Sequence, residues 1–394
     1  MDYLRIFVVF AFLIFSYIYL CISFIKMLHP KRNYLIYISV FIFMIIVNAG
    51  FWGMRYLRWQ GNIPENFYYI EWISYTLLGF MFFLLTCFFV ADVLFLSRYI
   101  FYFLRRKNHL KNRNSKIDIN RRSFLQFIAL GCASIISGIA FYNARKIPDV
   151  KKVFVPLKNL HPDLRSFQVV QLTDFHIGQT IGLNYVEAVV ERVNSLNPDV
   201  IVITGDLVDG FVDQIKNFVA PLGKLKAKYG VYYVTGNHEY YWDSLGWIEY
   251  MKSLGSIYLG NENRSFNVGD AHVVIGGLTD LRAENFDPKQ KMDPEKSIVG
   301  ASSQAHLKIL LAHQPNSAFE AAKLGFYHLQ ISGHTHGGQF WPGTWLIHLI
   351  QSFRAGLTMY ENMWVYVSRG TGYWGPPARL GSDSEITQIF FTNV

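Results

Sequence analysis

Three long apolar runs in the first hundred residues constrain this chain more than any other feature. They are Leu4–Ile25, Tyr34–Trp52 and Trp72–Leu96. Each is long enough to cross a hydrocarbon core of roughly 30 Å, which takes about 20 helical residues. Helices buried in a soluble core are the alternative, but such a core does not use three such runs so close together. The sequence therefore predicts three transmembrane helices within residues 1–97, with interfacial aromatic residues at Trp52, Tyr56, Trp59, Tyr68, Tyr69 and Trp72.

The basic residues of the N-terminal part indicate its orientation. Residues 1–150 hold 17 Lys and Arg against 6 Asp and Glu, whereas residues 151–394 hold 20 against 22. Because Lys and Arg mark cytoplasmic loops, residues 98–123 predict a basic cytoplasmic loop, and the basic loop Lys26–Arg32 agrees with it. This distribution places the N-terminus outside the cytoplasm. It also argues against nucleic-acid binding, because the C-terminal part is not basic.

A fourth apolar segment, residues 124–145, follows the basic loop. It begins beside Asn120–Gln126 (NRRSFLQ), which resembles a twin-arginine export signal, although such signals normally stand at an N-terminus. The plainer interpretation is a fourth transmembrane helix. Both interpretations place the rest of the chain outside the cytoplasm, whereas a helix that does not cross would leave it inside. The only cysteines are Cys21, Cys87 and Cys132, so the C-terminal part offers no disulfide framework and no thiolate zinc site.

The C-terminal part has the pattern of a layered α/β domain. Residues 146–164 are charged and contain proline, which predicts a linker, and residues 165–394 form the domain. Three β-like runs alternate with helical ones: Phe167–Thr173, Leu183–Ser195, Asp199–Thr204, Val212–Tyr229, Val231–Thr235 and Ser244–Leu254. Five later strands with few helices suggest a second sheet packed on the first: His272–Leu278, Leu307–Ala312, Phe326–Ile331, Trp364–Val367 and Glu385–Phe391.

Polar side chains follow five of these strands, where each strand ends. In α/β sheets this is where ligands bind. Any one of these residues alone could be a helix cap or a turn former. Caps and turns do not favour histidine so strongly, so the set as a whole indicates a site. In chain order it comprises Asp174, His176, Asp206, Asp209, Asn237, His238, Glu239, His313, His334 and His336, the last two within the run GHTHGG.

Carboxylate, amide and imidazole groups together suit a mid-row divalent metal. The number of candidates is too high for one ion, so the sequence predicts two divalent ions, with manganese, iron or zinc as the candidates. Two metals about 3.5–4 Å apart clamp a phosphoryl group and lower the pKa of a water held between them, which then attacks as hydroxide. The seven candidate ligands are Asp174, His176, Asp206, Asn237, His313, His334 and His336.

The pattern DxH…GDxxD…GNHE…H…GHxH over residues 168–340 resembles the calcineurin-like metallophosphoesterase family. Within this family the chain is most similar to a membrane-anchored bacterial branch. That branch includes YkuE- and YaeI-like phosphoesterases and UDP-2,3-diacylglucosamine pyrophosphatases. The resemblance implies an α/β fold, a two-sheet αββα sandwich, here preceded by an all-α transmembrane region. It also implies a metal-dependent phosphoric ester hydrolase in the bacterial cytoplasmic membrane.

The resemblance also assigns roles to the residues. It implies that Asp206 bridges the two metals, that His238 stabilises or protonates the leaving oxygen, and that Asp209 orients other side chains by hydrogen bonds. Glu239 would either support His238 or cap the following helix. The first metal would be held by Asp174, His176 and His336, and the second by Asn237, His313 and His334.

The substrate is indicated more weakly. Gln339–Ile350 is too apolar for an ordinary surface loop, and it either packs against the second sheet or forms a membrane-facing rim for an acyl chain. Arg354, Arg369 and Arg379 are candidates for pairing with a substrate phosphate, and the resemblance favours Arg379.

A lipid-linked or envelope phosphoester or pyrophosphate is therefore the leading substrate hypothesis, in a multi-pass protein whose catalytic domain lies on the extracytoplasmic side. Two alternatives are a catalytically silent metal-binding membrane sensor or scaffold, and a transporter with an appended domain. The scarcity of charges within the apolar runs argues against the transporter.

Overall fold

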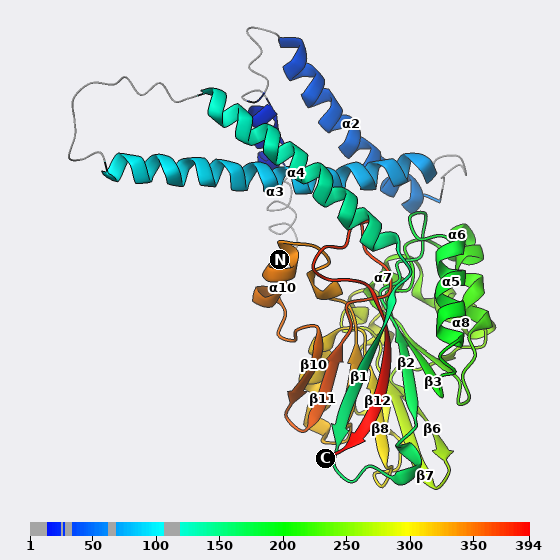
Figure 1. The fold of residues 1–394 in the computed structure, drawn as a ribbon. Coiled ribbons are helices and arrows are strands. Elements are labelled where there is room, and N and C mark those ends of the chain that lie inside the picture. Colours follow the sequence, from blue (N-terminus) through cyan, green and yellow to red (C-terminus); the bar gives the residue numbers. More distant parts are fainter. Residues whose placement is uncertain (1–13, 25–26, 28–33, 62–67, 106–118) are drawn as a thin grey trace. The chain divides into compact units, whose positions relative to one another are not determined.

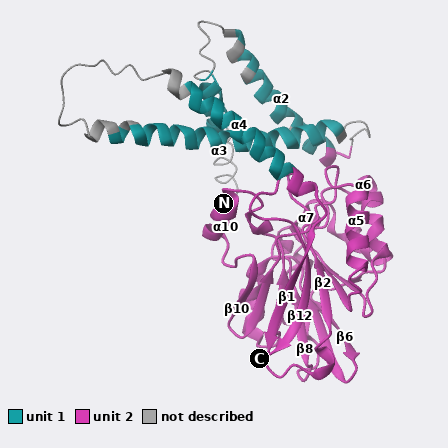
Figure 2. Cartoon of the chain, in the orientation of Figure 1, with its two compact units in different colours: residues 1–57, 63–141 teal, residues 58–62, 142–394 magenta. Residues whose placement is uncertain are grey.

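A computed structural model describes residues 14–24, 27, 34–61, 68–105 and 119–394 of the chain (Figure 1). The chain divides into two compact units (Figure 2). Unit 1 comprises residues 1–57 and 63–141, and unit 2 comprises residues 58–62 and 142–394.

Unit 1 is helical. Its main helices are α2 (Tyr34–Trp59), α3 (Tyr68–Arg105) and α4 (Ile119–Arg145), the last of which continues into unit 2. Among the described residues, Tyr69–Arg98 and Ser123–Arg145 are long and apolar enough to cross a membrane, and Ile14–Phe24 is a shorter apolar helix. The second predicted apolar run lies within α2, and the first lies partly outside the described residues. The predicted loop of residues 98–123 is wrong at its ends, because α3 extends to Arg105 and α4 begins at Ile119.

Unit 2 contains two six-stranded sheets, which confirms the predicted two-sheet architecture. The first sheet has the order β1-β12-β2-β3-β4-β5 and the second has the order β10-β11-β9-β8-β7-β6. The strands of the first are β1 (Asp149–Leu157), β12 (Glu385–Asn393), β2 (Gln168–Leu172), β3 (Val200–Thr204), β4 (Val231–Val234) and β5 (Ile257–Tyr258). Those of the second are β10 (Gly356–Tyr360), β11 (Met363–Val367), β9 (Leu329–Ser332), β8 (Leu307–Leu311), β7 (Ala271–Gly277) and β6 (Glu262–Val268).

The predicted linker of residues 146–164 is wrong, because most of it is strand β1. This strand pairs in parallel with β12 along its whole length, from Asp149 opposite Glu385 to Leu157 opposite Asn393. Burial alternates along its C-terminal half, where the side chains of Val153, Val155 and Leu157 are buried. The pattern was hidden by two lysines and a proline, which an edge strand tolerates because one of its sides makes no ladder hydrogen bonds.

Apolar side chains fill the space between the sheets. Val155, Val202, Ile309 and Tyr366 belong to one buried cluster that draws on both sheets. A second cluster joins the outer face of the first sheet to three helices, α5 (Leu183–Asn194), α6 (Val212–Val219) and α8 (Ser244–Ser253). A third joins the outer face of the second sheet to the short helix α9 (Ala318–Ala321). These layers make the αββα sandwich.

The predicted helix Val212–Tyr229 is too long. The α-helix ends at Val219 and a 3-10 turn with a proline near its start follows, Ala220–Lys224. Proline lacks the N–H that would continue the helix and clashes with the preceding turn. Two further helices complete the domain, α7 (Asn237–Tyr241) and α10 (Gly343–Ile350).

Candidate metal centre

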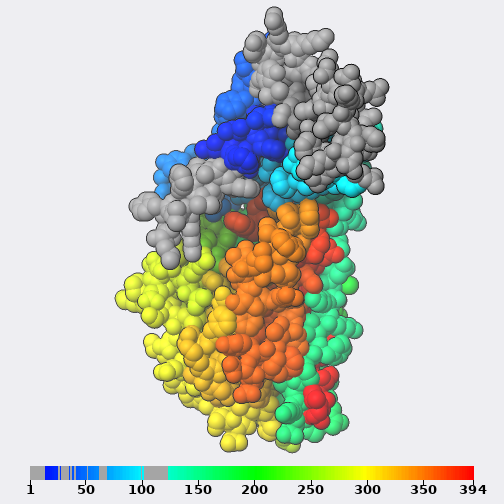
Figure 3. All heavy atoms as spheres, turned by 90° about the vertical axis from the view of Figure 1, so that its left-hand side faces the viewer, coloured from blue at the N-terminus to red at the C-terminus, as the bar shows by residue number. Residues whose placement is uncertain are grey.

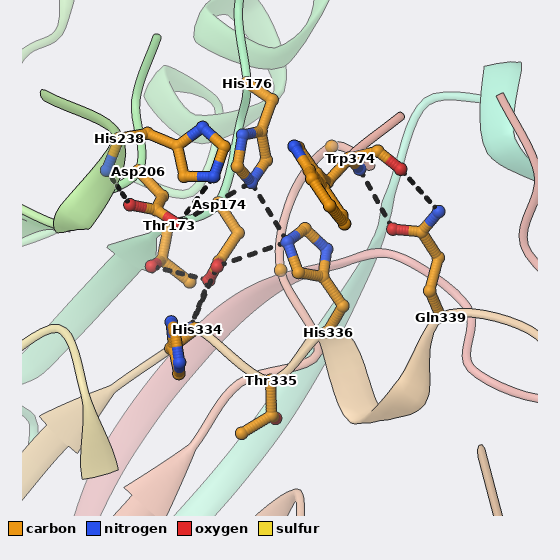
Figure 4. A network of polar contacts seen from close by, with 12 residues as sticks. Thr173, Asp174, His176, Asp206, His238, His334, Thr335, His336, Gln339 and Trp374 are labelled. Carbon is orange, nitrogen blue, oxygen red and sulfur yellow. Dashed lines mark hydrogen bonds and ion pairs between the residues drawn. The ribbon is translucent and has the colours of Figure 1, made fainter. Parts of the chain in front are cut away.

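The candidate site lies at the edge where strands of both sheets end. β2, β3 and β4 run parallel, and so do β7, β8 and β9. Hydrogen bonds join the strand ends across the sandwich: Gln171 Nε2 donates to Ser332 O at 2.9 Å, and His313 Nδ1 lies 2.8 Å from Thr204 O. The loops after five strands therefore meet at one place, which Figure 4 shows from close by.

Five of the predicted ligands have a left-handed backbone, with φ between 49° and 70°: Asp174, His176, Asp206, His334 and His336. Non-glycine residues seldom adopt this conformation, and it costs of order 1–3 kcal/mol at each position. The resulting sharp bends let successive side chains of one loop converge. Gly333 serves the same end, because a side chain there would overlap the Asp174 carboxylate and Thr173.

The first cluster consists of Asp174, His176 and His336. The Nε2 atoms of His176 and His336 are 3.0 Å apart, and His336 Nε2 lies 3.4 Å from Asp174 Oδ1. The Asp174 carboxylate accepts hydrogen bonds from the backbone N–H of His334 at 2.9 and 3.0 Å and from the Thr173 hydroxyl at 2.8 Å. The three side chains are buried and are held with their donor atoms facing one another.

The second cluster consists of Asp206, His313 and His334, whose donor atoms lie within 4.8 Å of one another. His313 Nε2 is 3.2 Å from Asp206 Oδ2, and the same oxygen is 3.8 Å from His176 Nε2 in the first cluster. Asp206 therefore lies between the two clusters, the position in which a bridging carboxylate is expected. Asn237 lies close to Asp206. The backbone N–H of the next residue, His238, donates a hydrogen bond to Asp206 Oδ1 at 2.9 Å.

The polar atoms at this edge fit divalent cations. Two buried atoms of the predicted ligands, Asn237 Oδ1 and His334 Nδ1, have no polar partner among the described residues. Two more, His313 Nε2 and His176 Nδ1, lie 3.2 Å from the carboxylates of Asp206 and Asp209. Buried polar atoms are almost always paired, so two unpaired atoms beside these carboxylates favour a bound ion there. The donors are imidazole nitrogen and carboxylate or amide oxygen, with no thiolate, a set that suits mid-row divalent metals.

The ionisation of these groups also suits metal binding. Burial alone would raise the pKa of Asp206, but His313, His238 and His176 outweigh it and hold this pKa well below the usual range. Burial lowers the pKa of His334 to about 3, so this imidazole is neutral with a free lone pair. Burial opposes protonation of His313, but Asp206 raises its pKa to about 10. A cation bound between these two residues would take the place of that proton.

His238 and Asp209 form a pair beside the two clusters. His238 Nδ1 lies 2.5 Å from Asp209 Oδ1, while Asp209 Oδ2 lies 3.2 Å from His176 Nδ1. The Nε2 atom of His238 therefore faces Asp206, 3.9 Å from Oδ2. Burial opposes protonation of His238, but Asp206 and Asp209 raise its pKa to about 9, so the ring is protonated at neutral pH. Its Nε2 could serve as a proton donor or, after deprotonation, as a metal ligand, since it also lies within ligand distance of His176 and Asp206.

Glu239 caps a helix and holds the loop that carries Asp206. Its carboxylate accepts from the backbone N–H groups of Gly236 at 2.6 Å, Leu207 at 2.7 Å and Asp206 at 3.1 Å. The bond to the N–H of Gly236, the residue before α7, is one half of a capping box, and glycine has no side chain to supply the other half. The sequence left open whether Glu239 supports His238 or caps the helix, and these bonds favour the cap.

The prediction that Arg379 pairs with a substrate phosphate is wrong, because this side chain is completely buried. Its guanidinium donates to the carbonyl oxygens of His336 at 3.0 Å, Ser382 at 3.2 Å and Gly372, and another of its nitrogens lies 3.1 Å from His336 Nδ1. Together with burial, the positive charge of Arg379 holds the pKa of His336 well below its ordinary value. Arg379 therefore keeps His336 neutral and in place, and it does not reach solvent.

Trp374 is a residue at this site that the sequence did not single out. Its ring centroid lies 5.9 Å from that of His238, and the two rings meet edge to face. Gln339 fixes the Trp374 backbone, accepting from its N–H and donating to its carbonyl oxygen, both at 2.9 Å (Figure 4). The signal available in the sequence was the glycine-rich stretch after β11, another strand that ends at this edge.

Comparisons with known proteins agree with this geometry. A family model described as calcineurin-like phosphoesterase matches residues 167–338. A transmembrane protein with metallophosphoesterase domain from Danio rerio is 34% identical over 362 residues, which cover 89% of this chain and 79% of that protein. An uncharacterized metallophosphoesterase from Helicobacter pylori is 33% identical, covering 77% and 80%. The uncharacterized metallophosphoesterase YkuE from Bacillus subtilis is 28% identical, covering 68% and 96%.

Proposed function

Because the chain belongs to the calcineurin-like metallophosphoesterase family, we propose that it holds two divalent cations and hydrolyses a phosphoester or pyrophosphate bond in a lipid-linked or envelope substrate. The observation that carries this proposal is that Asp206 of the second cluster also lies 3.8 Å from His176 of the first, so that the two clusters meet at one carboxylate. A single oxygen of this carboxylate faces both clusters, and Asn237 Oδ1 and His334 Nδ1 have no polar partner among the described residues.

Two bound cations would supply Lewis-acid stabilisation of the phosphoryl group and an activated water nucleophile. The side chains around them would orient the substrate and move one proton. His238 would donate from Nε2 to the leaving oxygen, while Asp209 holds its Nδ1 proton and fixes the ring. Asp206 would contact both ions. The first ion would be held by Asp174, His176 and His336, and the second by Asn237, His313 and His334.

The membrane part supports a substrate at the membrane. The chain carries two described helices that can cross a membrane, and α4 leads directly into the first strand of the catalytic domain. The distribution of basic residues supports a multi-pass protein of a bacterial cytoplasmic membrane, with the catalytic domain on the extracytoplasmic side. Alkaline phosphatase, which is active only outside the cytoplasm, and a fluorescent protein that matures inside it can each be fused after Val394 to test this side.

The function is tested with the full-length protein purified in detergent. After removal of metal with a chelator, hydrolysis of bis(4-nitrophenyl) phosphate should be absent, and manganese, iron or zinc should restore it. Elemental analysis should find two ions per chain, and Asp206→Asn should lose both ions and activity. His272→Ala is the matched control, because His272 lies on β7 and bonds to Asn267 outside the site. Full metal occupancy with no turnover of any phosphoester would favour the sensor or scaffold instead.

A further inference from the structure

The helix α10 presents an unusually apolar surface next to the GHTHGG loop (residues 333–338), which carries the candidate ligands His334 and His336. None of the eight helix residues is buried. Trp345 is 61% exposed, and Leu349 and Ile350 are each 73% exposed. The α10 patch comprises these three residues together with Trp341 and Leu346, which are also exposed. The alternative that this stretch packs against the second sheet is therefore wrong, and Figure 3 shows α10 (orange) at the surface of unit 2.

This patch is attached to the site itself. α10 follows the GHTHGG loop, and its first residue, Gly343, packs so closely on Gly338 that a side chain at Gly338 would overlap it. A cavity of about 120 Å³ is lined on one side by residues of α10. Its walls combine Thr335 of the GHTHGG loop, Thr344 and His348 of α10, and the cations Arg354 and Arg369. The Arg369 guanidinium also lies 3.3 Å from Glu385 Oε2. The cavity thus connects the apolar helix to the residues that flank the metal ligand His336.

The sequence around α10 contains no acidic residue that would repel anionic lipid. Residues 339–360 contain no aspartate or glutamate, and Arg354 is their only charged residue apart from His348 when it is protonated. Tryptophan is enriched at membrane interfaces, where its ring lies at the level of the headgroups. A contiguous apolar surface of this kind on a folded domain marks a protein or membrane contact.

The chain topology points to a membrane as the partner. β1 is parallel to β12, and β12 is antiparallel to β2, so β1 begins at the edge where β2 ends and the metal ligands lie. Only residues 146–148 separate α4 from β1. Three extended residues span at most about 10 Å. A helix long enough to cross a membrane therefore enters the domain at the site-bearing edge, the edge that also carries α10.

We propose that the α10 patch inserts into the interface of the bilayer that α4 crosses, so that a lipid presents its headgroup to the cavity of Arg354 and Arg369 and then to the metal centre. The docking part of this inference is independent of catalysis. The substrate part rests on the proposed function and narrows the substrate class to lipids with an anionic headgroup.

The docking part is tested by spin labelling of the full-length chain in phosphatidylglycerol nanodiscs. Cys21, Cys87 and Cys132 are replaced by alanine, and a nitroxide is attached to Leu349→Cys. The control is Val394→Cys, which is 78% exposed and adjoins the far end of β12, about 30 Å from the site-bearing edge by the rise of a nine-residue strand. The label at position 349 should be more accessible to oxygen and less accessible to a nickel chelate than the control label.

Two results would overturn the docking proposal. One is a label at position 349 that the nickel chelate reaches as readily as it reaches position 394. The other is dipolar broadening between labels of two chains, which would mean that the patch joins copies of the protein.

The substrate part has its own measurement. Leu349→Glu with Ile350→Glu should lower the ratio of nitrophenyl-phospholipid hydrolysis to bis(4-nitrophenyl) phosphate hydrolysis at least tenfold, because the charges repel the patch from anionic lipid. An unchanged ratio contradicts the lipid route. If the unaltered protein hydrolyses neither substrate, the proposed function fails, while the labelling result still decides whether α10 meets the membrane.

Discussion

His238 offers the sharpest test of the chemistry, because its geometry allows two different roles. Its Nδ1 atom is held by Asp209 at 2.5 Å, and its Nε2 atom faces Asp206 at 3.9 Å. If Nε2 protonates the leaving oxygen, His238→Ala should remove a general acid and leave both ions bound. General-acid catalysis contributes about 10²–10⁴-fold, which corresponds to roughly 3–5 kcal/mol in the activation free energy.

The size of the defect should depend on the leaving group. A poorly acidic alcohol needs a proton as the bond to phosphorus breaks, whereas a nitrophenolate leaves readily without one. His238→Ala should therefore lose close to the full factor with an alkyl or phenyl phosphodiester and only a small factor with a dinitrophenyl phosphodiester. Asp209→Asn keeps the ring but removes the anion that orients it, so we expect an intermediate loss of about 10–100-fold with the same trend.

The assay is a plot of log kcat against leaving-group pKa for the unaltered protein, His238→Ala, Asp209→Asn and the control His272→Ala. Metal content is measured on the same samples. A steeper plot for His238→Ala with two ions retained supports the acid role. An equal loss for every leaving group, or the loss of an ion, would refute it and make His238 a ligand together with His176 and Asp206.

Three further substitutions test the framework of the site. Gly333→Ala should displace the Asp174 carboxylate, because the new methyl group would overlap it. Metal affinity should then fall about 10–100-fold in a metal titration, and unchanged affinity would show that the loop can move aside. Arg379→Met should leave two buried carbonyl oxygens without donors, at about 1–3 kcal/mol for each, and so lower the melting temperature by roughly 5–25 °C. Arg379→Lys should not restore it, because lysine lacks the planar fork, and full rescue by lysine would mean that charge alone matters. Glu239→Gln should lower the free energy of unfolding by about 1–3 kcal/mol, because the amide N–H₂ would face backbone N–H groups whose hydrogen bonds the carboxylate now accepts. A denaturant unfolding curve without any shift would contradict the capping role.

The sequence predicted the location of the site because the relevant signals are local. Each candidate ligand directly follows an apolar run that ends at it, and the carboxyl ends of parallel strands must share an edge. His313 after β8 and His334 after β9 illustrate this, because their rings lie 5.1 Å apart although their strands were recognised separately. The left-handed backbone of residues such as Asp174 and His176 has no such signal. It is imposed by the surrounding fold, as conformational strain at functional sites generally is.

The failures share a different cause, because they concern partners that are distant in the sequence. β1 was taken for a linker since its partner strand, β12, lies more than 200 residues later, and only that pairing makes its alternation meaningful. Arg379 was a candidate for a substrate phosphate because a guanidinium pairs well with phosphate and because the resemblance favoured it, yet the side chain is completely buried. Its partners are backbone carbonyl oxygens, whose positions no residue pattern encodes.

The sequence left two interpretations open for the segment that contains the α10 patch. From composition alone, Gln339–Ile350 could equally be core or membrane-facing rim, because both require apolar side chains. The structure removes the first alternative, since α10 has no buried residue. The remaining apolar surface costs free energy in water, of the order of 25 cal/mol for each Å² exposed, so a partner that covers it would gain that free energy. A bilayer reached through the three-residue connection between α4 and β1 would be such a partner, and it needs only elements the chain already contains.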